Sequence, residues 1–116
     1  MHHKEITHLF IQRFKEVMGR GPSLVRINIS ENIINADIKG VLTIPEQSLL
    51  KNSINNKVLI KVIRKQLMEL VFRDFSAELQ TITNIDDLEL LNYTFVIDFE
   101  NDRQVMVLVC NKVLSE

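Results

Sequence analysis

The stretch VRINISENIINADIK, residues 25–39, alternates apolar and polar side chains with a period of two on both sides of a short polar interruption. Such alternation is typical of antiparallel strands that bury one face and leave the other in water. A two-residue turn at residues 31–32 places Arg26 opposite Asp37 and keeps opposite residues on one face. The sequence therefore predicts a β-hairpin here, with Asp37 as the partner of the Arg26 side chain.

A second stretch with the same period, residues 93–110, predicts another hairpin. A two-residue turn at residues 101–102 places Ile97 opposite Met106 on an apolar face. The reverse face is also half apolar, with Val96, Val105, Val107 and Val109. A sheet with two apolar faces needs cover on both. Helices can cover one face, and we expect more of this chain or a second copy to cover the other.

Apolar residues recur at helical spacing in three parts of the chain. They predict an amphipathic helix over residues 4–18, a short helix over residues 46–51 and a long helix over residues 56–81. The apolar ladder of the long helix is wide, which indicates burial on more than one side, or a partner. The order α-β-β-α-β-β predicts an α+β two-layer sandwich, in which helices pack on one face of a four-stranded antiparallel sheet.

Local signals mark the helix ends. Gly19 is suited to the left-handed position that closes the first helix, and Gly21 with Pro22 prevents the helix from resuming. Thr43 and Glu46, three residues apart, form the pattern of a capping box, in which each side chain bonds the backbone N–H of the other.

The composition is that of one globular domain. The chain has 116 residues, of which 46% are hydrophobic and 25% charged, and we expect residues 1–116 to share one core. The single cysteine, Cys110, excludes an internal disulfide and a cysteine-built zinc site, and its place on the predicted core face favours a packed thiol over a nucleophile. No apolar run approaches the roughly 20 residues that span a bilayer, and the N-terminus lacks a signal-peptide core, so we expect a cytoplasmic protein.

Charge is distributed unevenly along the chain. Residues 1–65 hold 11 basic and 5 acidic residues, whereas residues 66–116 hold 3 basic and 10 acidic ones, which gives net charges of +6 and −7. Such asymmetry indicates a charged partner or self-complementary association.

The densest basic cluster falls at the start of the long helix. Lys57, Lys61 and Lys65 are spaced by four residues, with Arg64 beside them. Each like-charge neighbour at this spacing costs about 0.2–0.5 kcal/mol, and cations near a helix N-terminus oppose the macrodipole. One interpretation is a surface that contacts an anion or an acidic partner. The other is a solvated face that is neutralised by acidic residues of the second half, such as Glu69.

Patterns for common catalytic chemistry are absent from the sequence. There is no glycine-rich phosphate loop, and the cluster of His2, His3 and His8 lacks the spaced carboxylates of a metal site. We therefore predict no catalytic residues, no metal and no cofactor. Nucleic acid is a disfavoured partner for the basic helix, residues 57–65, because the net charge is −1 and no aromatic residues interleave with the basic ones.

Two segments together resemble a known family. They are MGRGP at residues 18–22, after an amphipathic helix, and GVLT at residues 40–43 with Glu46, after a hairpin; LIKVIR at residues 59–64 then begins a long helix. This combination resembles the MpsC-like family of small bacterial proteins, whose name refers to a sodium-translocating, membrane-potential-generating system. The resemblance implies a soluble accessory protein associated with ion or inorganic-carbon transport at the bacterial membrane. It implies no established enzymatic reaction and no agreed catalytic residues.

Most residues of these motifs have a structural interpretation, but one does not. Neither a cap nor a turn requires the guanidinium of Arg20, which is suited to an anion or a carboxylate. The residues interpreted as structural are Gly19, Gly21, Pro22, Gly40, Thr43 and Glu46. The candidate residues for binding an anion or a partner are Arg20, Lys57, Lys61, Arg64 and Lys65.

Three functions are open from the sequence. The preferred one is a non-enzymatic, cytoplasmic homodimer that binds an anion or a membrane-transport subunit at the inner face of the membrane. The second is a nucleic-acid-binding regulator that uses the basic helix. The third is an enzyme that acts on a small anion, held by Arg20 and Arg64, with an acidic residue as the base.

Overall fold

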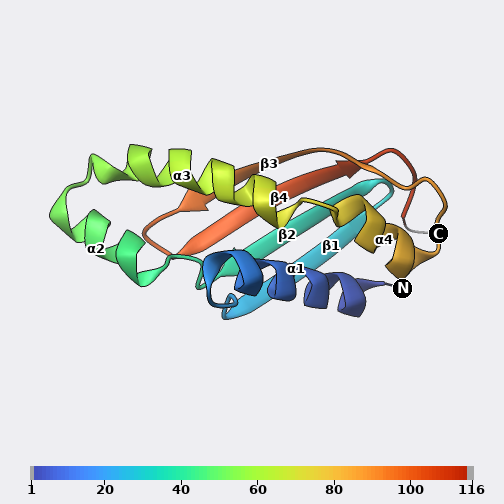
Figure 1. The fold of residues 1–116 in the computed structure, drawn as a ribbon, viewed down its shortest axis with the longest axis horizontal. Coiled ribbons are helices and arrows are strands. Elements are labelled where there is room, and N and C mark those ends of the chain that lie inside the picture. The colour runs from blue at the N-terminus through green and yellow to red at the C-terminus, as the bar shows by residue number, and fades with distance from the viewer. Residues whose placement is uncertain (1, 115–116) are drawn as a thin grey trace.

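The computed structural model describes residues 2–114, and this part of the chain forms helices on one side of a sheet (Figure 1). In chain order the elements are α1 (His3–Met18), β1 (Leu24–Ser30), β2 (Ile33–Lys39), α2 (Ile44–Asn52), α3 (Asn56–Val71), α4 (Phe75–Thr83), β3 (Leu90–Asp98) and β4 (Arg103–Cys110). The four strands form one antiparallel sheet in the order β1-β2-β4-β3. The α+β class and the antiparallel four-stranded sheet predicted from the sequence are confirmed.

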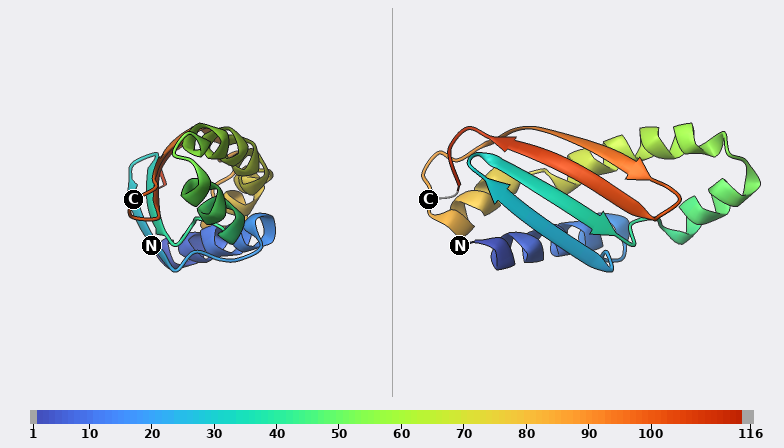
Figure 2. Two further views of the ribbon diagram at one scale, coloured as in Figure 1. Left: turned by 90° about the vertical axis from the view of Figure 1, so that its left-hand side faces the viewer. Right: turned by 180° about the vertical axis from the view of Figure 1, so that it is seen from behind.

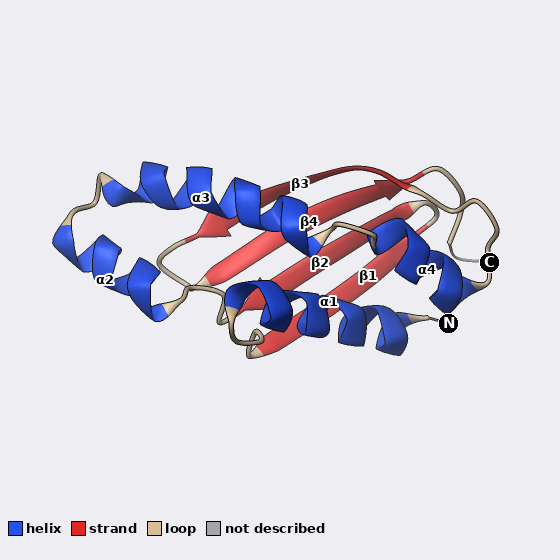
Figure 3. Ribbon diagram, viewed as in Figure 1, coloured by secondary structure: helices blue, strands red, loops and turns tan. Residues whose placement is uncertain are grey.

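The helices lie on one face of the sheet, which gives the two layers expected from the sequence (Figure 3 and the left view of Figure 2). Seen from behind, the other face of the sheet carries none of the helices formed by residues 2–114 (right view of Figure 2). Val96 and Val105, which are paired across β3 and β4, are exposed by 69% and 38%. The second apolar face of the last hairpin is therefore left uncovered by residues 2–114.

The first hairpin has the predicted register but a different ion pair. Arg26 stands opposite Asp37, and the turn occupies residues 31–32, where Glu31 has a φ of +55°. Asp37 nevertheless pairs with Arg103 on β4, with 2.7 Å from Nε to Oδ1 and 2.8 Å from Nη2 to Oδ2. These hydrogen bonds hold the pKa of Asp37 below its usual value. The predicted pairing of the Arg26 and Asp37 side chains is wrong because β2 lies between two strands, and β4 supplies the better-placed guanidinium.

The second hairpin differs from its predicted register by two residues. Ile97 stands opposite Gln104, whereas the sequence predicted Met106. The connection is a four-residue loop, residues 99–102, in which the Asp98 side chain accepts hydrogen bonds from a backbone and a side-chain N–H of the loop. Because the difference is an even number of residues, each side chain keeps its predicted face.

The predicted long helix, residues 56–81, is two helices. Asp74 between them has a φ of +60°, which interrupts the α-helical backbone. The guanidinium of Arg13 on α1 donates to Leu70 O at 2.7 Å and to Val71 O at 2.9 Å, so it binds carbonyl groups of the last turn of α3, of which Leu70 O also accepts from Arg73 N–H at 3.3 Å. The helix prediction fails at this point because the capping group comes from a distant part of the chain.

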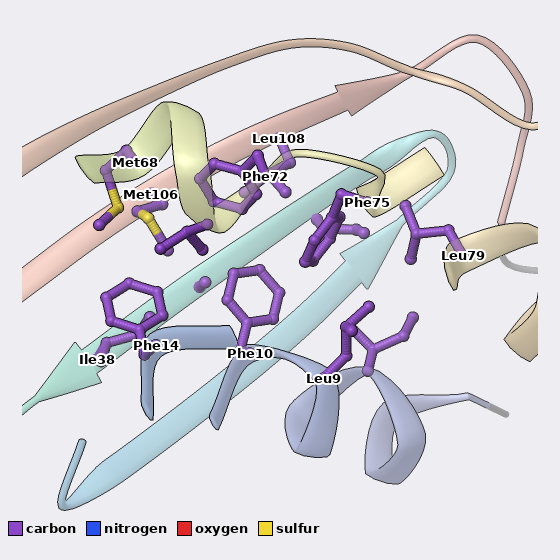
Figure 4. Packing of buried hydrophobic residues seen from close by; sticks show 14 of the residues in the cluster. Leu9, Phe10, Phe14, Ile38, Met68, Phe72, Phe75, Leu79, Met106 and Leu108 are labelled. Atoms are coloured by element: carbon purple, nitrogen blue, oxygen red, sulfur yellow. The ribbon is translucent and has the colours of Figure 1, made fainter. Parts of the chain in front are cut away.

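The core lies between the sheet and α1, α3 and α4 (Figure 4). Phe10, Phe72 and Phe75 meet edge to face, with ring centroids 5.3 Å apart for Phe10 and Phe75 and 5.0 Å apart for Phe72 and Phe75. Such pairs contribute about 0.5–1.5 kcal/mol beyond the area they bury. Cys110 on β4 is fully buried, as predicted, and burial raises the pKa of its thiol to about 11.

Part of the helical layer projects beyond the sheet. α2 and the first half of α3 extend past the end of the strands (Figure 1), and the molecule measures 47 × 22 × 22 Å. We call this projecting pair of helices, residues 44–63, the arm. Some of the candidate binding residues lie where the arm joins the sheet, and others lie on the surface of α3.

Candidate functional site

Three sides of α3 differ in character because successive residues of a helix point about 100° apart. The side chains of Ile60, Arg64 and Met68 point into the protein and are fully buried. A neighbouring stripe carries the lysines of the basic cluster, and a third side carries exposed aliphatic residues. The basic cluster of the sequence is thus divided between the interior and the surface.

Arg64, predicted to bind an anion or a partner, is a buried structural residue with an exposed fraction of 0%. Its Nη1 donates to Gln104 Oε1 at 2.9 Å, and its Nη2 donates to Val41 O at 3.0 Å and to Glu46 Oε1 at 2.6 Å. The prediction for Arg64 is therefore wrong, because helical phase directs this side chain inward and Glu46 neutralises its charge within the chain. The enzymatic alternative loses one of its two arginines for the same reason.

The residues around Arg64 join the arm to the sheet. Thr43 N–H donates to Glu46 Oε1 at 2.8 Å and Glu46 N–H donates to Thr43 Oγ1 at 3.3 Å, so the predicted capping box is confirmed. Gly40 has a φ of +71°, and a Cβ there would lie 2.5 Å from Ser23 Oγ, so both conformation and space require glycine. We call Gly40, Val41, Thr43, Glu46 and Arg64 the arm junction.

The first motif closes α1 and leaves Arg20 apart from the arm. Gly19 has a φ of +85° and donates its N–H to Lys15 O at 3.0 Å, as predicted for a left-handed cap, and α1 does not resume after Gly21 and Pro22. Arg20 is exposed and has no hydrogen bond or ion pair within residues 2–114. It follows α1, which lies along the long side of the molecule opposite α3 (Figure 1). No single site therefore contains all of the predicted binding residues.

The accessible basic residues of α3 form one stripe, Lys57, Lys61 and Lys65, which we call the lysine face. The Nζ atoms of Lys57 and Lys61 lie 5.6 and 6.0 Å from the centroid of the Phe99 ring, at the range of a cation–π contact worth about 0.5–1 kcal/mol when exposed. None of the three lysines forms an ion pair in the part of the chain that the structure describes. Acidic residues such as Glu69 therefore form no direct ion pair with this face within residues 2–114.

A groove of about 540 Å³ lies between the lysine face and β3. Lys61 and Lys65 line one wall, and residues 92–97 of β3 line the other. Burial, and then the nearby carboxylate of Glu69, raise the pKa of the Tyr93 phenol in this wall above its ordinary value. The groove thus combines positive charge, apolar side chains and the edge of a strand.

Sequence reasoning found the lysines of this groove but missed its other wall. The sequence predicts a strand from residue 93 onward, but a single sequence does not reveal that this strand is at the edge of the sheet beside α3. Phe99 was also missed, because the predicted turn began two residues later. The sequence gives one indication of this surface, because the last hairpin is apolar on both faces and one of them needs cover beyond the helices.

The described residues supply neither a cluster of metal ligands nor a membrane span. Within residues 2–114, no group of three or more His, Cys, Asp and Glu side chains is placed to hold a metal ion, and no helix there is long and apolar enough to cross a membrane.

The fold and the groove define a small α+β domain with a basic face beside an open sheet edge. The chain belongs to the family described as Na+-translocating membrane potential-generating system (MpsC), whose family model matches residues 1–112. The resemblance seen in the sequence is thereby confirmed. Comparisons with curated proteins and with solved structures found no match.

Proposed function

We propose that this protein is a non-enzymatic accessory component of a membrane-potential-generating system that transports an ion or inorganic carbon. In this proposal it acts at the cytoplasmic side of the membrane, where its lysine face binds an acidic region of a transport subunit. The family description supports the link with such a system. Arg64 is excluded from the binding surface by its burial, and Arg20 by its separate position.

The observation that carries this proposal is a set of three neighbouring lysines that form no ion pair with any described residue, beside a groove of about 540 Å³. Like charges at this spacing disfavour the free helix by about 0.2–0.5 kcal/mol per neighbouring pair. A partner that brings carboxylates to the face turns this repulsion into attraction. Complementary charge of this kind raises the association rate and selects the partner.

The test is capture of membrane subunits by the immobilised protein from detergent-solubilised membranes of the native host. The variant Lys61→Glu/Lys65→Glu reverses two charges of the lysine face and is expected to reduce capture at least tenfold. The matched control, Lys39→Glu/Lys51→Glu, makes the same change of net charge at two exposed lysines away from the groove. Equal capture by the two double variants would contradict the proposal.

A nucleic-acid-binding regulator is the second candidate, because the same lysines form a basic stripe on an exposed helix. Binding to phosphates releases counterions, so affinity would fall steeply as salt is added. A gel-shift experiment at low salt distinguishes the two functions. A lysine-dependent complex with DNA or RNA would favour the regulator, and the absence of any complex would exclude nucleic-acid binding as the function.

We also propose a homodimer that forms through the aliphatic side of the arm. Ile54, in the turn before α3, and Val58, Leu59 and Val62, on α3, are exposed by 71%, 68%, 47% and 55%, which is unusual for neighbouring aliphatic residues. Covering one such side chain completely contributes about 1.5–3 kcal/mol. Light scattering over a concentration series is expected to show a dimer that Val62→Glu converts to a monomer, and a monomer of the unaltered protein at every concentration would contradict this part.

A further inference from the structure

β3 is an edge strand with little protection against pairing over residues 92–97, because the irregularity in its register lies at its start, between Leu90 and Asn92. It lies at the end of the sheet order, and residues 2–114 place no strand on its outer side. Its nine residues include no proline and no lysine, the two residues that most often protect such edges. Alternate residues of an edge strand direct their N–H and C=O groups away from the sheet. β3 therefore offers backbone donors and acceptors to an incoming segment, except for the Tyr93 N–H, which already donates to Asn92 Oδ1 at 2.8 Å.

The groove places this row of backbone groups beside the lysine face. The wall of the groove formed by residues 92–97 faces Lys61 and Lys65 across a space of about 540 Å³. A segment that paired with β3 would lie in this groove and would direct every second side chain toward the helices. Those side chains would meet the two ammonium groups. Its other side chains would share the bare face of the sheet with Val96, which is 69% exposed.

We propose that the partner binds as an added strand along β3, with acidic side chains directed at Lys61 and Lys65 and aliphatic side chains beside Val96. The inference rests on the proposed function, because it uses the same lysine face, and it adds the conformation and the sequence pattern of the partner segment. Backbone hydrogen bonds to β3 supply much of the affinity, and the alternation of acidic and aliphatic residues supplies the selectivity.

Charge argues against a second copy of this chain as the occupant. If β3 paired with β3 of another molecule about a two-fold axis, both α3 helices would lie on the same face of the joined sheet. The two lysine faces would then approach each other across the new pairing, and none of these lysines has an ion-pair partner within residues 2–114. An acidic segment brings the opposite charge to the same place.

The probe is a synthetic, N-acetylated peptide that alternates glutamate and valine over the length of residues 92–97, labelled for fluorescence anisotropy. Three comparisons are made with it. One replaces its glutamates with lysines, one methylates all of its backbone nitrogens without changing its charge, and one uses the Lys61→Glu/Lys65→Glu protein. Each change is expected to weaken binding at least tenfold. On binding of the unmodified peptide, alternate amides of residues 92–97 are expected to become protected from hydrogen exchange.

The outcomes separate this inference from the function on which it rests. If the methylated peptide binds as well as the parent peptide, or if the parent shows no binding up to about 1 mM, the added strand is excluded. Lysine-dependent capture of membrane subunits would then still support the proposed function. Protection of the same amides by protein concentration alone, without peptide, would identify a second copy as the occupant and would also overturn the inference.

Discussion

Arg64 and Lys61 stand three residues apart on α3, but their side chains have opposite surroundings. The guanidinium of Arg64 is fully buried and bonded to three acceptors of its own chain. The ammonium of Lys61 faces the ring of Phe99 and an open groove. The basic cluster seen in the sequence is therefore two features: a buried cation that joins the arm to the sheet, and an exposed lysine face.

The two features also differ in what their charge does for stability. A buried ion pair gives little net stabilisation because both ions lose their hydration, but removal of one partner leaves an uncompensated charge. Within the described chain, Arg64 Nε and Glu46 Oε2 are buried without a hydrogen-bond partner, so the pair is incompletely satisfied. Exposed lysines lose almost no hydration and are open to a binding partner. This difference can be tested by variants of each feature.

The largest effect is expected for Arg64→Met, which fills similar space but leaves the Glu46 carboxylate buried without its cation. The free energy of unfolding should fall by about 3–5 kcal/mol, as measured by denaturation with guanidinium chloride. Adding Glu46→Gln removes the unpaired charge and keeps an oxygen for the capping box, so part of the loss should be recovered. If Arg64→Met alone were as stable as the unaltered protein, the buried arginine and the exposed lysines would not differ in their effect on stability, and this account would be contradicted.

A smaller effect is expected when the arm junction is strained without changing any charge. Gly40→Ala introduces a Cβ at a positive φ, 2.5 Å from Ser23 Oγ, and should lower the free energy of unfolding by about 1–3 kcal/mol. Gly21→Ala is the matched control, because its Cβ would lie 3.5 Å from Ile11 Cγ2, an ordinary contact. Similar losses for the two alanine variants in thermal unfolding would argue against a constrained junction.

Arg103 provides an intermediate case, because it is paired with Asp37 but half exposed. The hydrogen bonds from Arg103 lower the pKa of Asp37 in the folded state. The ion pair therefore stabilises the fold above the ordinary aspartate pKa of about 3.9, and this stabilisation is lost as the pH falls through the lowered pKa. Arg103→Gln should therefore reduce stability at pH 7 and make little difference in strong acid. Unfolding curves over a pH series measure this, and an equal loss at both ends of the series would contradict it.

The smallest effect on stability is expected at the lysine face. The variant Lys61→Glu/Lys65→Glu should unfold within about 0.5 kcal/mol of the unaltered protein, as is usual for surface substitutions. Lys39→Glu/Lys51→Glu should behave in the same way, so that a difference in binding between the two variants reports on position and not on folding. Calorimetry checks this expectation. A large loss confined to the first variant would mean that the lysines also hold the arm in place.

The sequence predicted what depends on neighbouring residues and missed what depends on strand order or distant contacts. The pairing of Arg26 opposite Asp37 and the box of Thr43 and Glu46 follow from local periods and spacings. The ion pair of Asp37 with Arg103 joins residues 66 positions apart, and the bond from Arg13 that helps to end α3 spans 58 positions. Neither of these long-range contacts produces a spacing or a period that a single sequence would reveal.

The candidate site was predicted in the same uneven way. The four-residue spacing of the lysines correctly placed them on one stripe of a helix. The burial of Arg64 was missed because both sides of the helix carry aliphatic residues, so periodicity alone did not reveal which side faces the sheet. The groove depends on β3 being at the sheet edge, which follows from the pairing of β2 with β4. Strand order of this kind is decided by the whole core and not by any motif.

The most direct test of the lysine face as the binding surface is hydrogen exchange of the full chain with and without detergent-solubilised membranes of the native host. The account predicts that protection on addition of membranes is confined to residues 57–65 of α3 and residues 92–97 of β3, and that it disappears in Lys61→Glu/Lys65→Glu. Protection that falls instead on the loop containing Arg20, or on the bare face of β1 and β2, would contradict it.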